Sequence, residues 1–300
     1  MLKIAFDPIY AHPLPEGHRF PMLKYELIPA QLLHEGLIAN ENLFFPDHLS
    51  EEIILLTHDA EYWEQLRDLK LSAKEQRRIG FPLSRQLVNR EICIGQGTID
   101  GCHYAFEYGV AFNAAGGTHH AGTNWGEGFC MLNDQGMAAN YLLNNKLAAS
   151  ILIIDLDVHQ GNGTAQIFEN EPRVFTFSMH GANNFPYRKE RSDLDIPLPD
   201  DIQDEAYLEI LYRTLPQLIQ QQKPDFIFYL AGVDVLATDK LGKLALSKDA
   251  CKKRDEFVFQ QAINNNVPVQ VSMGGGYSAQ IKDIVEAHCN TYRVANKLYF

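Results

Sequence analysis

Short hydrophobic runs recur along the chain and alternate with longer segments in which hydrophobic residues are three or four positions apart. This alternation predicts strands that take turns with helices, which is the pattern of an α/β fold. The runs at 150–156 and 226–231 are almost entirely apolar, as expected for strands buried on both faces of a mainly parallel sheet. The expected strands are residues 3–6, 110–113, 150–156, 174–179, 226–231 and 267–273.

Two helical segments stand out between these runs. Residues 206–222 carry leucines at threefold and fourfold spacing, with Asp204 as a candidate N-cap and Pro216 as the point where the helix kinks or ends. Residues 249–264 form the second helical segment, and their charged run is interpreted as a solvated face. Residues 182–201 are expected to form a long polar loop, and loops of this length are often functional.

Composition and charge narrow the class of protein. The 300 residues are 46% hydrophobic, which is ordinary for a globular chain and allows two domains or one large α/β domain. The formal net charge of −12 does not favour binding to nucleic acid. No apolar run approaches the roughly 20 residues that span a bilayer. Five cysteines without a C-x-x-C pair, and an N-terminus unlike a signal peptide, predict a reduced protein in the cytoplasm.

The strongest chemical signal follows the apolar run at 150–156. Asp155, Asp157 and His159 occupy alternate positions, so on an extended chain their side chains point the same way. Two carboxylates and an imidazole that converge at the end of a strand are costly to bury unless a cation lies among them. The alternative is a solvated strand end with an Asx turn.

Asp234 follows the second apolar run, at 226–231, and can complete this site. Asp157, His159 and Asp234 together make a nitrogen and oxygen site with one position left for water, as catalytic zinc requires. Taken alone, an Asp at a strand end is most often a helix cap or a turn residue.

Two further groups follow other strand ends. A glycine turn delivers His119 and His120 just after the strand that ends at Asn113, and paired histidines serve as metal ligands, as acid and base groups, or as plain surface residues. Near the C-terminus, three glycines lead from a strand to Tyr277, whose alternative role is simple packing.

Taken together in chain order, these groups of residues resemble the motifs of the zinc-dependent histone deacetylase family over nearly the whole chain. Residues 234–247 and 253–259, with Asn162 where the class I branch usually has Asp, are similar to the class IV branch. The motifs that carry the resemblance are His12-Pro13, His18-Arg19-Phe20, GGTHHA (116–121), GFCMLND (128–134), DLDVHQGNGT (155–164), AGVD (231–234) and GGGY (274–277).

The resemblance implies the arginase/deacetylase fold, with a single domain over residues 1–300 and a central eight-stranded, mainly parallel sheet flanked by helices. It implies one zinc ion per chain, bound by Asp157, His159 and Asp234. The implied activity is removal of acyl groups from lysine side chains of a protein or peptide. The class IV likeness favours long fatty acyl groups over acetyl, with room for them beside small residues at Gly116, Gly117 and Ala121.

The resemblance also implies roles for the other site residues. His120 is expected to be the general base for the attacking water, and His119 to help protonate the leaving amine. Tyr277 would donate a hydrogen bond to the oxyanion, and Asp155 would orient His119. Asn162 can orient His120 without adding charge, which leaves the protonation state of that histidine open.

Further residues of the family pattern map to a second ion and to the substrate path. Asp155 and Ser178, with backbone carbonyls that include that of Met179, correspond to a structural potassium site. Arg19 is assigned to an inner cavity through which the acid product leaves. The residues assigned to the acyl channel are Gly128, Phe129, Phe185 and Gly275.

Three other functions are considered on the same sequence. A two-manganese ureohydrolase would need further ligands near Asp234, where Asp239 is the nearby candidate. A deacetylase of a small acylated amine, such as an acetylpolyamine, would be favoured by acidic residues at the channel mouth and by a dimer-forming insertion, and neither is obvious in the sequence. A catalytically silent binding module conflicts with the complete set of ligands, histidines and tyrosine.

Overall fold

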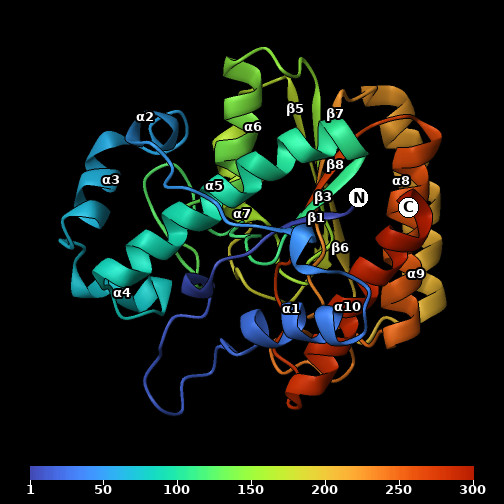
Figure 1. The fold of residues 1–300 in the computed structure, drawn as a ribbon, viewed down its shortest axis with the longest axis horizontal. Coiled ribbons are helices and arrows are strands. Elements are labelled where there is room, and N and C mark those ends of the chain that lie inside the picture. The colour runs from blue at the N-terminus through green and yellow to red at the C-terminus, as the bar shows by residue number, and fades with distance from the viewer.

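The computed structural model describes residues 1–300 and places one eight-stranded sheet between two layers of helices (Figure 1). The strand order is β2-β1-β3-β8-β7-β4-β5-β6, and every neighbouring pair is parallel. The strands are β1 (Lys3–Ala5), β2 (Leu43–Phe44), β3 (Val110–Asn113), β4 (Ile151–Asp155), β5 (Val174–Gly181), β6 (Leu194–Leu198), β7 (Phe226–Leu230) and β8 (Val269–Ser272).

Helices α8, α9 and α10 pack in sequence along one side of the sheet with α1, whereas α5, α6 and α7 cover the other side (Figure 1). Helices α2, α3 and α4 extend beyond α5 and build the part of the molecule farthest from the C-terminal helices. The helices are α1 (Lys24–His34), α2 (Glu51–Ile54), α3 (Ala60–Arg67), α4 (Ala73–Ile79), α5 (Arg85–Tyr108), α6 (Asp134–Asn144), α7 (Asn162–Phe168), α8 (Asp204–Gln222), α9 (Lys248–Asn264) and α10 (Ile281–Tyr299), with short 3-10 turns at Pro8–Tyr10 and Asn40–Asn42.

The α/β class and the parallel sheet are confirmed, but the sequence pattern missed both edge strands. β2 has only two residues, and β6 lies inside the stretch 182–201 that was expected to be a loop. β6 is mostly half-buried and contains Pro197, which has no N–H to donate to a second neighbouring strand and so suits an edge position. Edge strands therefore lack the continuous apolar run by which the inner strands are found.

Helix α8 ends at Gln222, as the expected range 206–222 has it, and it continues through Pro216. Proline removes one backbone donor, but the buried leucines on the same helix keep its apolar face packed on both sides of that position. The residue before the helix is Gln203, and Asp204 instead accepts hydrogen bonds from the backbone and hydroxyl of Ser247 at 2.8 and 2.6 Å.

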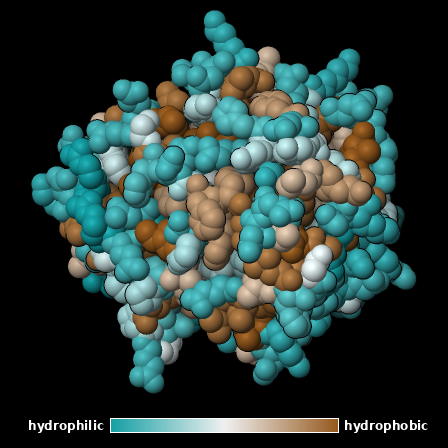
Figure 2. All heavy atoms as spheres, viewed as in Figure 1, coloured by the Kyte–Doolittle hydropathy of each residue, from teal (hydrophilic) through white to brown (hydrophobic).

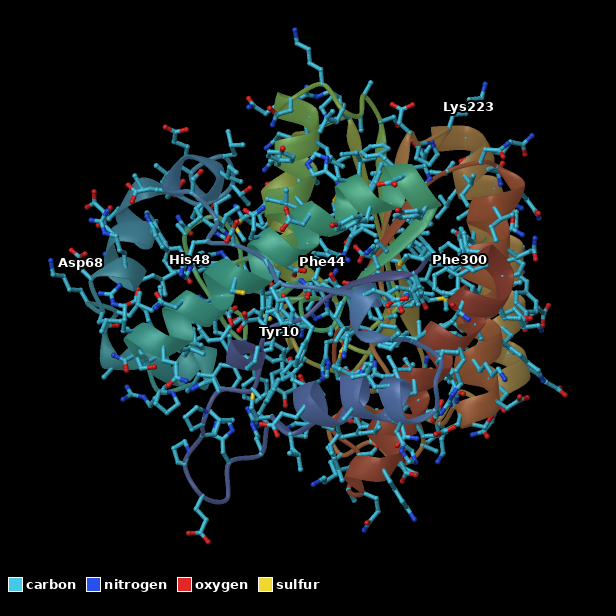
Figure 3. All side chains as sticks on the ribbon, viewed as in Figure 1. Tyr10, Phe44, His48, Asp68, Lys223 and Phe300 are labelled. Carbon is cyan, nitrogen blue, oxygen red and sulfur yellow. The ribbon has the colours of Figure 1, made fainter.

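The interior is apolar and the surface is mixed. The face shown in Figure 2 is mostly hydrophilic, with smaller hydrophobic areas between the polar side chains. Tyr10 is fully buried, whereas Asp68 and Lys223 reach outward at the periphery (Figure 3). All five cysteines are buried and free of disulfides. No helix is both long enough and apolar enough to cross a membrane.

The carboxyl ends of four adjacent strands bring the sequence motifs together. β3, β8, β7 and β4 are consecutive neighbours in the sheet, although they are scattered along the chain. In a parallel sheet these ends lie at the same edge, and ligands of α/β proteins bind there. The motifs that follow β3, β8, β7 and β4 consequently meet at one place.

Candidate active site

Two carboxylates and one imidazole converge at the ends of β4 and β7. Asp157 and His159 follow β4, Asp234 follows β7, and all three side chains are buried. Nδ1 of His159 lies 3.0 Å from Oδ1 of Asp157 and 3.1 Å from Oδ2 of Asp234. No other group of His, Cys, Asp and Glu side chains in the chain comes together in this way.

These residues fit a zinc ion by their chemistry and by their spacing. Nitrogen and oxygen ligands at about 2.0–2.2 Å from a tetrahedral ion lie roughly 3.3 Å from one another, close to the separations observed here. Backbone N–H groups already hold both carboxylates: Gly275 N donates to Asp157 Oδ2 at 2.7 Å, His159 N to Asp157 Oδ1 at 3.0 Å, and Val158 N to Asp234 Oδ1 at 3.0 Å. Backbone amides therefore hold the two carboxylates in a fixed orientation toward His159.

The electrostatics of the cluster favour a positive charge at its centre. Burial lowers the pKa of His159, but hydrogen bonds to Asp157 and Asp234 outweigh it and raise that pKa to about 10. Burial and the neighbouring Asp157 raise the pKa of Asp234 to about 7. Burial opposes ionisation of Asp157 as well, yet His119 and His159 hold its pKa well below the usual range.

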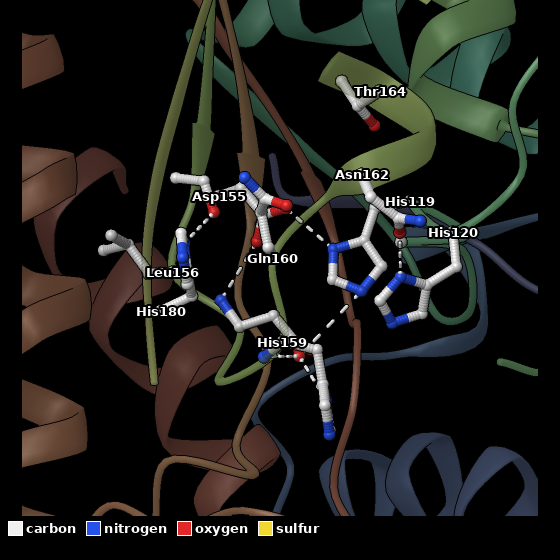
Figure 4. Close-up of polar contacts among 12 residues, drawn as sticks. His119, His120, Asp155, Leu156, His159, Gln160, Asn162, Thr164 and His180 are labelled. Atoms are coloured by element: carbon white, nitrogen blue, oxygen red, sulfur yellow. Dashed lines mark hydrogen bonds and ion pairs between the residues drawn. The ribbon is translucent and has the colours of Figure 1, made fainter. Parts of the chain in front are cut away.

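The two adjacent histidines have different partners, as Figure 4 shows. Nδ1 of His119 lies 2.7 Å from Oδ2 of Asp155, and Nδ1 of His120 lies 2.6 Å from Oδ1 of Asn162. Burial lowers the pKa of His119, but the carboxylates of Asp155 and Asp157 outweigh it and raise the pKa overall. Burial, together with the charges of neighbouring histidines, lowers the pKa of His120 well below its ordinary value. One histidine thus favours the charged form and the other the neutral form.

Two hollows meet at this site: an inner cavity behind the cluster and an outer channel that leads to the surface. Tyr277 lines both of them. Its backbone N–H donates to Asp239 at 2.6 Å, which fixes the start of its loop. Lys24 also holds this loop in place, because its buried ammonium donates to the carbonyl of Gly274 at 3.0 Å. Burial lowers the pKa of Lys24 to about 8.

A hollow of about 330 Å³ leads from the surface to the cluster. Gly128, Phe129 and Phe185 line it, together with His120, His159 and Tyr277. Phe129 has a φ of +71°, a left-handed conformation that costs a bulky residue about 1–3 kcal/mol. Its N–H donates to the Ile79 carbonyl at 2.7 Å, which helps to hold the ring in the channel wall.

Two of the residues assigned from the sequence lie elsewhere. Gly275 lines the inner cavity and not the outer channel, and a Cβ there would collide with the carboxylate of Asp234. Arg19 is exposed at the channel mouth, where its guanidinium lies 5.0 Å from the ring centre of Phe129. The inner cavity is lined instead by Arg90 of α5, together with Tyr25.

The ends of β4 and β5 place the residues assigned to potassium side by side. Asp155 and Ser178 are direct partners in the β4–β5 register, and both are buried. The hydroxyl of Ser178 lies 2.9 Å from Nδ1 of His180. Met179, the next residue of β5, is also fully buried.

Three residues that the sequence pattern did not single out support the site. Asp134 accepts hydrogen bonds from the backbone of Gly117 and Thr118, both at 2.9 Å, and so holds the turn before the histidines. Glu127 accepts from Asn162 at 2.6 Å, and Arg90 lies in the inner cavity. Asp134 ends a motif that the sequence does show, but Glu127 and Arg90 follow no buried strand and carry no such signal.

Comparisons with known proteins agree with this geometry. The family pattern described as "Histone deacetylase domain" matches residues 18–292. An uncharacterised protein of Picosynechococcus is 44% identical over 296 residues, which are 99% of each chain. Histone deacetylase 2 of Arabidopsis thaliana is 28% identical, covering 87% of this chain and 70% of that protein. Histone deacetylase 1 of Homo sapiens is 27% identical, covering 93% of this chain and 61% of that protein.

Solved structures show the same fold. A histone deacetylase homologue crystallised with the compound SAHA superposes with a TM-score of 0.84 at 24% identity, over 99% of this chain and 84% of that one. A homologue from Aquifex aeolicus gives 0.82 at 24% identity, over 97% and 82%. The fold is therefore the arginase/deacetylase fold, as the sequence resemblance implied.

The chain belongs to the histone deacetylase family. Membership of this family makes it a hydrolase of the deacetylase type, with a buried Asp-His-Asp cluster suited to a metal ion.

Proposed function

We propose that this protein is a zinc-dependent lysine deacylase, one catalytic domain over residues 1–300 with one zinc ion per chain. The observation that carries the proposal is the buried cluster of Asp157, His159 and Asp234 at the base of a channel that also reaches His120 and Tyr277. His120 and Tyr277 thus share the channel with the cluster, and His119 lines the inner cavity beside it.

The reaction needs an activated water, a polarised carbonyl and a proton for the leaving nitrogen. Zinc, when bound, polarises the carbonyl and makes water a stronger acid. His120, whose pKa burial and the neighbouring histidines lower, accepts the proton of the attacking water. His119, whose pKa is raised overall, donates a proton to the departing amine while Asp155 holds its ring. Tyr277 donates a hydrogen bond to the oxygen on which negative charge develops.

A structural potassium ion at the ends of β4 and β5 is part of the proposal. The adjacent, buried Asp155 and Ser178 supply one carboxylate and one hydroxyl oxygen, which are ligand types suited to a hard cation. Met179 would contribute its backbone carbonyl.

The size of the inner cavity supports an acetyl-sized acyl group. The cavity behind the cluster measures about 40 Å³, room for a few water-sized groups at roughly 10–15 Å³ each. Gly116 and Gly117 line this cavity, but a Cβ at either position would strike Asp134 or Gly274, so the space beside them is narrow. Long fatty acyl groups, which the class IV resemblance favours, would require this cavity to widen.

The charges at the channel mouth support a lysine substrate in a peptide over a polyamine. Arg19, Arg78 and Lys243 line the hollow. Glu127 pairs with Arg78 and Asp200 lies 4.0 Å from Lys243, so the charge that disfavours a polycationic amine comes mainly from Arg19. Asp239 is already bonded to the backbone of Leu241, Gly242 and Tyr277, which leaves it unsuited to hold a second metal. The cytoplasmic location expected from the unpaired cysteines stays a prediction.

The test is a screen of the purified protein against one peptide that carries acetyl-, octanoyl- or myristoyl-lysine, alongside acetylpolyamines. We expect one zinc per chain by elemental analysis and the highest kcat/KM on acetyl-lysine peptide. Two divalent ions per chain would contradict the mononuclear mechanism. Preferential hydrolysis of octanoyl- or myristoyl-lysine would contradict the assignment of the acyl group and leave the mechanism in place.

A further inference from the structure

A line of three hydrogen bonds leads from the protein surface to His120. Arg78 Nε donates to Glu127 Oε2 at 2.6 Å, and Asn162 Nδ2 donates to Glu127 Oε1 at 2.6 Å. Asn162 Oδ1 lies 2.6 Å from Nδ1 of His120. The Arg78 side chain is 46% exposed and that of Glu127 only 10%, so the line runs from solvent into the interior.

Backbone contacts hold Arg78 and Glu127 together. Gly128 N donates to the carbonyl of Arg78 at 3.1 Å, and Phe129 N donates to that of Ile79 at 2.7 Å. The guanidinium of Arg78 also lies 4.6 Å from the ring centre of Trp125. The carboxylate of Glu127 is therefore fixed in front of Asn162.

The donors and acceptors along this line allow one arrangement only. A carboxylate accepts hydrogen bonds and donates none, so Asn162 must turn its NH2 toward Glu127 and its oxygen toward His120. That oxygen also only accepts, so His120 must carry its proton on Nδ1. The lone pair of a neutral His120 then lies on Nε2, which has no protein partner, and the ring lines the channel.

We propose that Glu127 is a positioning residue for the reaction: it fixes the amide orientation of Asn162 and thereby the tautomer of His120. The contrast with His119 shows why such a residue is needed. Asp155 bonds His119 directly, and a carboxylate accepts from Nδ1–H whichever way it is turned. An amide can face the ring with either its oxygen or its nitrogen, and Glu127 removes the second choice.

The proposal rests on the proposed function and is tested by kinetics of the zinc-loaded enzyme. Glu127→Ala should lower kcat about 10- to 100-fold with little change in KM, as is typical of groups that orient an active-site residue. Asn162→Asp alone should also be poor, because it sets two carboxylates against each other where the atoms now lie 2.6 Å apart. Adding Glu127→Gln to Asn162→Asp should restore activity, since the new amide can donate to the new carboxylate. A merely structural role for Glu127 predicts no such rescue.

A measurement independent of activity is the 15N spectrum of His120 in histidine-labelled protein. The wild type should show the tautomer protonated on Nδ1, and Glu127→Ala a mixture of tautomers. Glu61→Gln, which removes an exposed carboxylate of α3, is the matched control and should change neither readout. Thermal melting checks that each variant is folded, and Glu127→Met, which keeps the length of the side chain but removes its oxygen acceptors, replaces Glu127→Ala if that variant is not.

The outcomes separate the two proposals. A wild type that hydrolyses no acyl amide would contradict the proposed function, while the tautomer of His120 would still report on Glu127. An active wild type whose Glu127→Ala variant keeps both kcat and the Nδ1 tautomer would overturn the inference alone, as would an Asn162→Asp variant that Glu127→Gln fails to rescue.

Discussion

The floor of the site and the mouth of its channel are built in opposite ways. On the floor, Asp157 and Asp234 are 1% and 0% exposed and are oriented by backbone amides at the ends of central strands. At the mouth, Arg19, Arg78 and Lys243 are exposed side chains from loops and a helix end. Charges interact strongly where water is excluded and weakly where it is not. We therefore expect the floor to set the chemistry and the mouth to adjust which substrate enters.

Removal of a proposed metal ligand from the floor should have the largest effect on activity. Asp157→Ala deletes one ligand and one negative charge, so zinc content and activity should fall together, activity by ~1,000-fold or more. Elemental analysis and hydrolysis of acyl-lysine peptide check this. Asp200→Ala, at an exposed aspartate near Lys243, is the matched control. A variant that keeps its zinc and its turnover would exclude Asp157 as a ligand.

The next largest effect concerns the boundary between floor and mouth, where Tyr277 stands. Tyr277→Phe removes only the hydroxyl, so folding and zinc content should be unchanged. Loss of one donor to a developing oxyanion typically lowers kcat about 100- to 1,000-fold. Steady-state kinetics on the same peptide measure it, and near-normal turnover would leave Tyr277 with a packing role.

Low pH should reduce the stability of the folded protein, because the buried His58 is held in its neutral form. Its Nδ1 bonds the Gly122 carbonyl at 2.9 Å and its Nε2 accepts from Asn133 N at 3.0 Å, so the native site requires the neutral ring. Burial lowers the pKa of His58 from 6.5 to about 4. Between these values the unfolded chain binds the extra proton, so the free energy of unfolding falls as pH drops, by about 3 kcal/mol in total for this residue.

Urea unfolding of the wild type and of His58→Gln at pH 7, 6 and 5 tests this prediction. The wild type should lose stability more steeply than the variant over this range. A mouth variant, Lys243→Glu, serves as the control and should follow the wild-type slope, since its side chain is half exposed. Parallel curves for wild type and His58→Gln would show that His58 is not the titrating group.

The smallest effects are expected at the mouth. Lys243→Glu and Arg19→Glu should each lower kcat/KM for a peptide with acidic residues beside the acyl-lysine by about two- to fivefold, and raise it for an acetylpolyamine. High salt should remove both changes. Lys252→Glu, on the exposed face of α9, is the control with the same change of charge. Equal changes for both substrates would argue against charge selection at the mouth.

What the sequence could predict follows the same division. The inner strands and the residues after them were found because a long apolar run locates a buried strand, and the chemistry follows its end. Asp157, His159 and Asp234 are brought together as their spacing suggested. The edge strands β2 and β6 carry no such run and were missed.

The supporting residues were missed for a related reason. Arg90 projects from the long helix α5, and Glu127 from a loop held by the end of α4. Their positions depend on how helices dock on the sheet, which no local pattern records. Arg19, in contrast, was placed in the inner cavity by family resemblance, but its segment runs over the surface and leaves it at the mouth.

The strand order also determines when the site can form during folding. β4 and β7 are neighbours in the sheet, yet β5, β6 and α8 lie between them in the chain. Parallel pairing across so long a connection is slow, because the closure entropy precedes the contacts that offset it. During synthesis, the pair Asp157 and His159 leaves the ribosome well before Asp234, and the glycine loop that orients Asp157 comes later still. We therefore expect loading of the proposed metal to follow folding of the nearly complete chain.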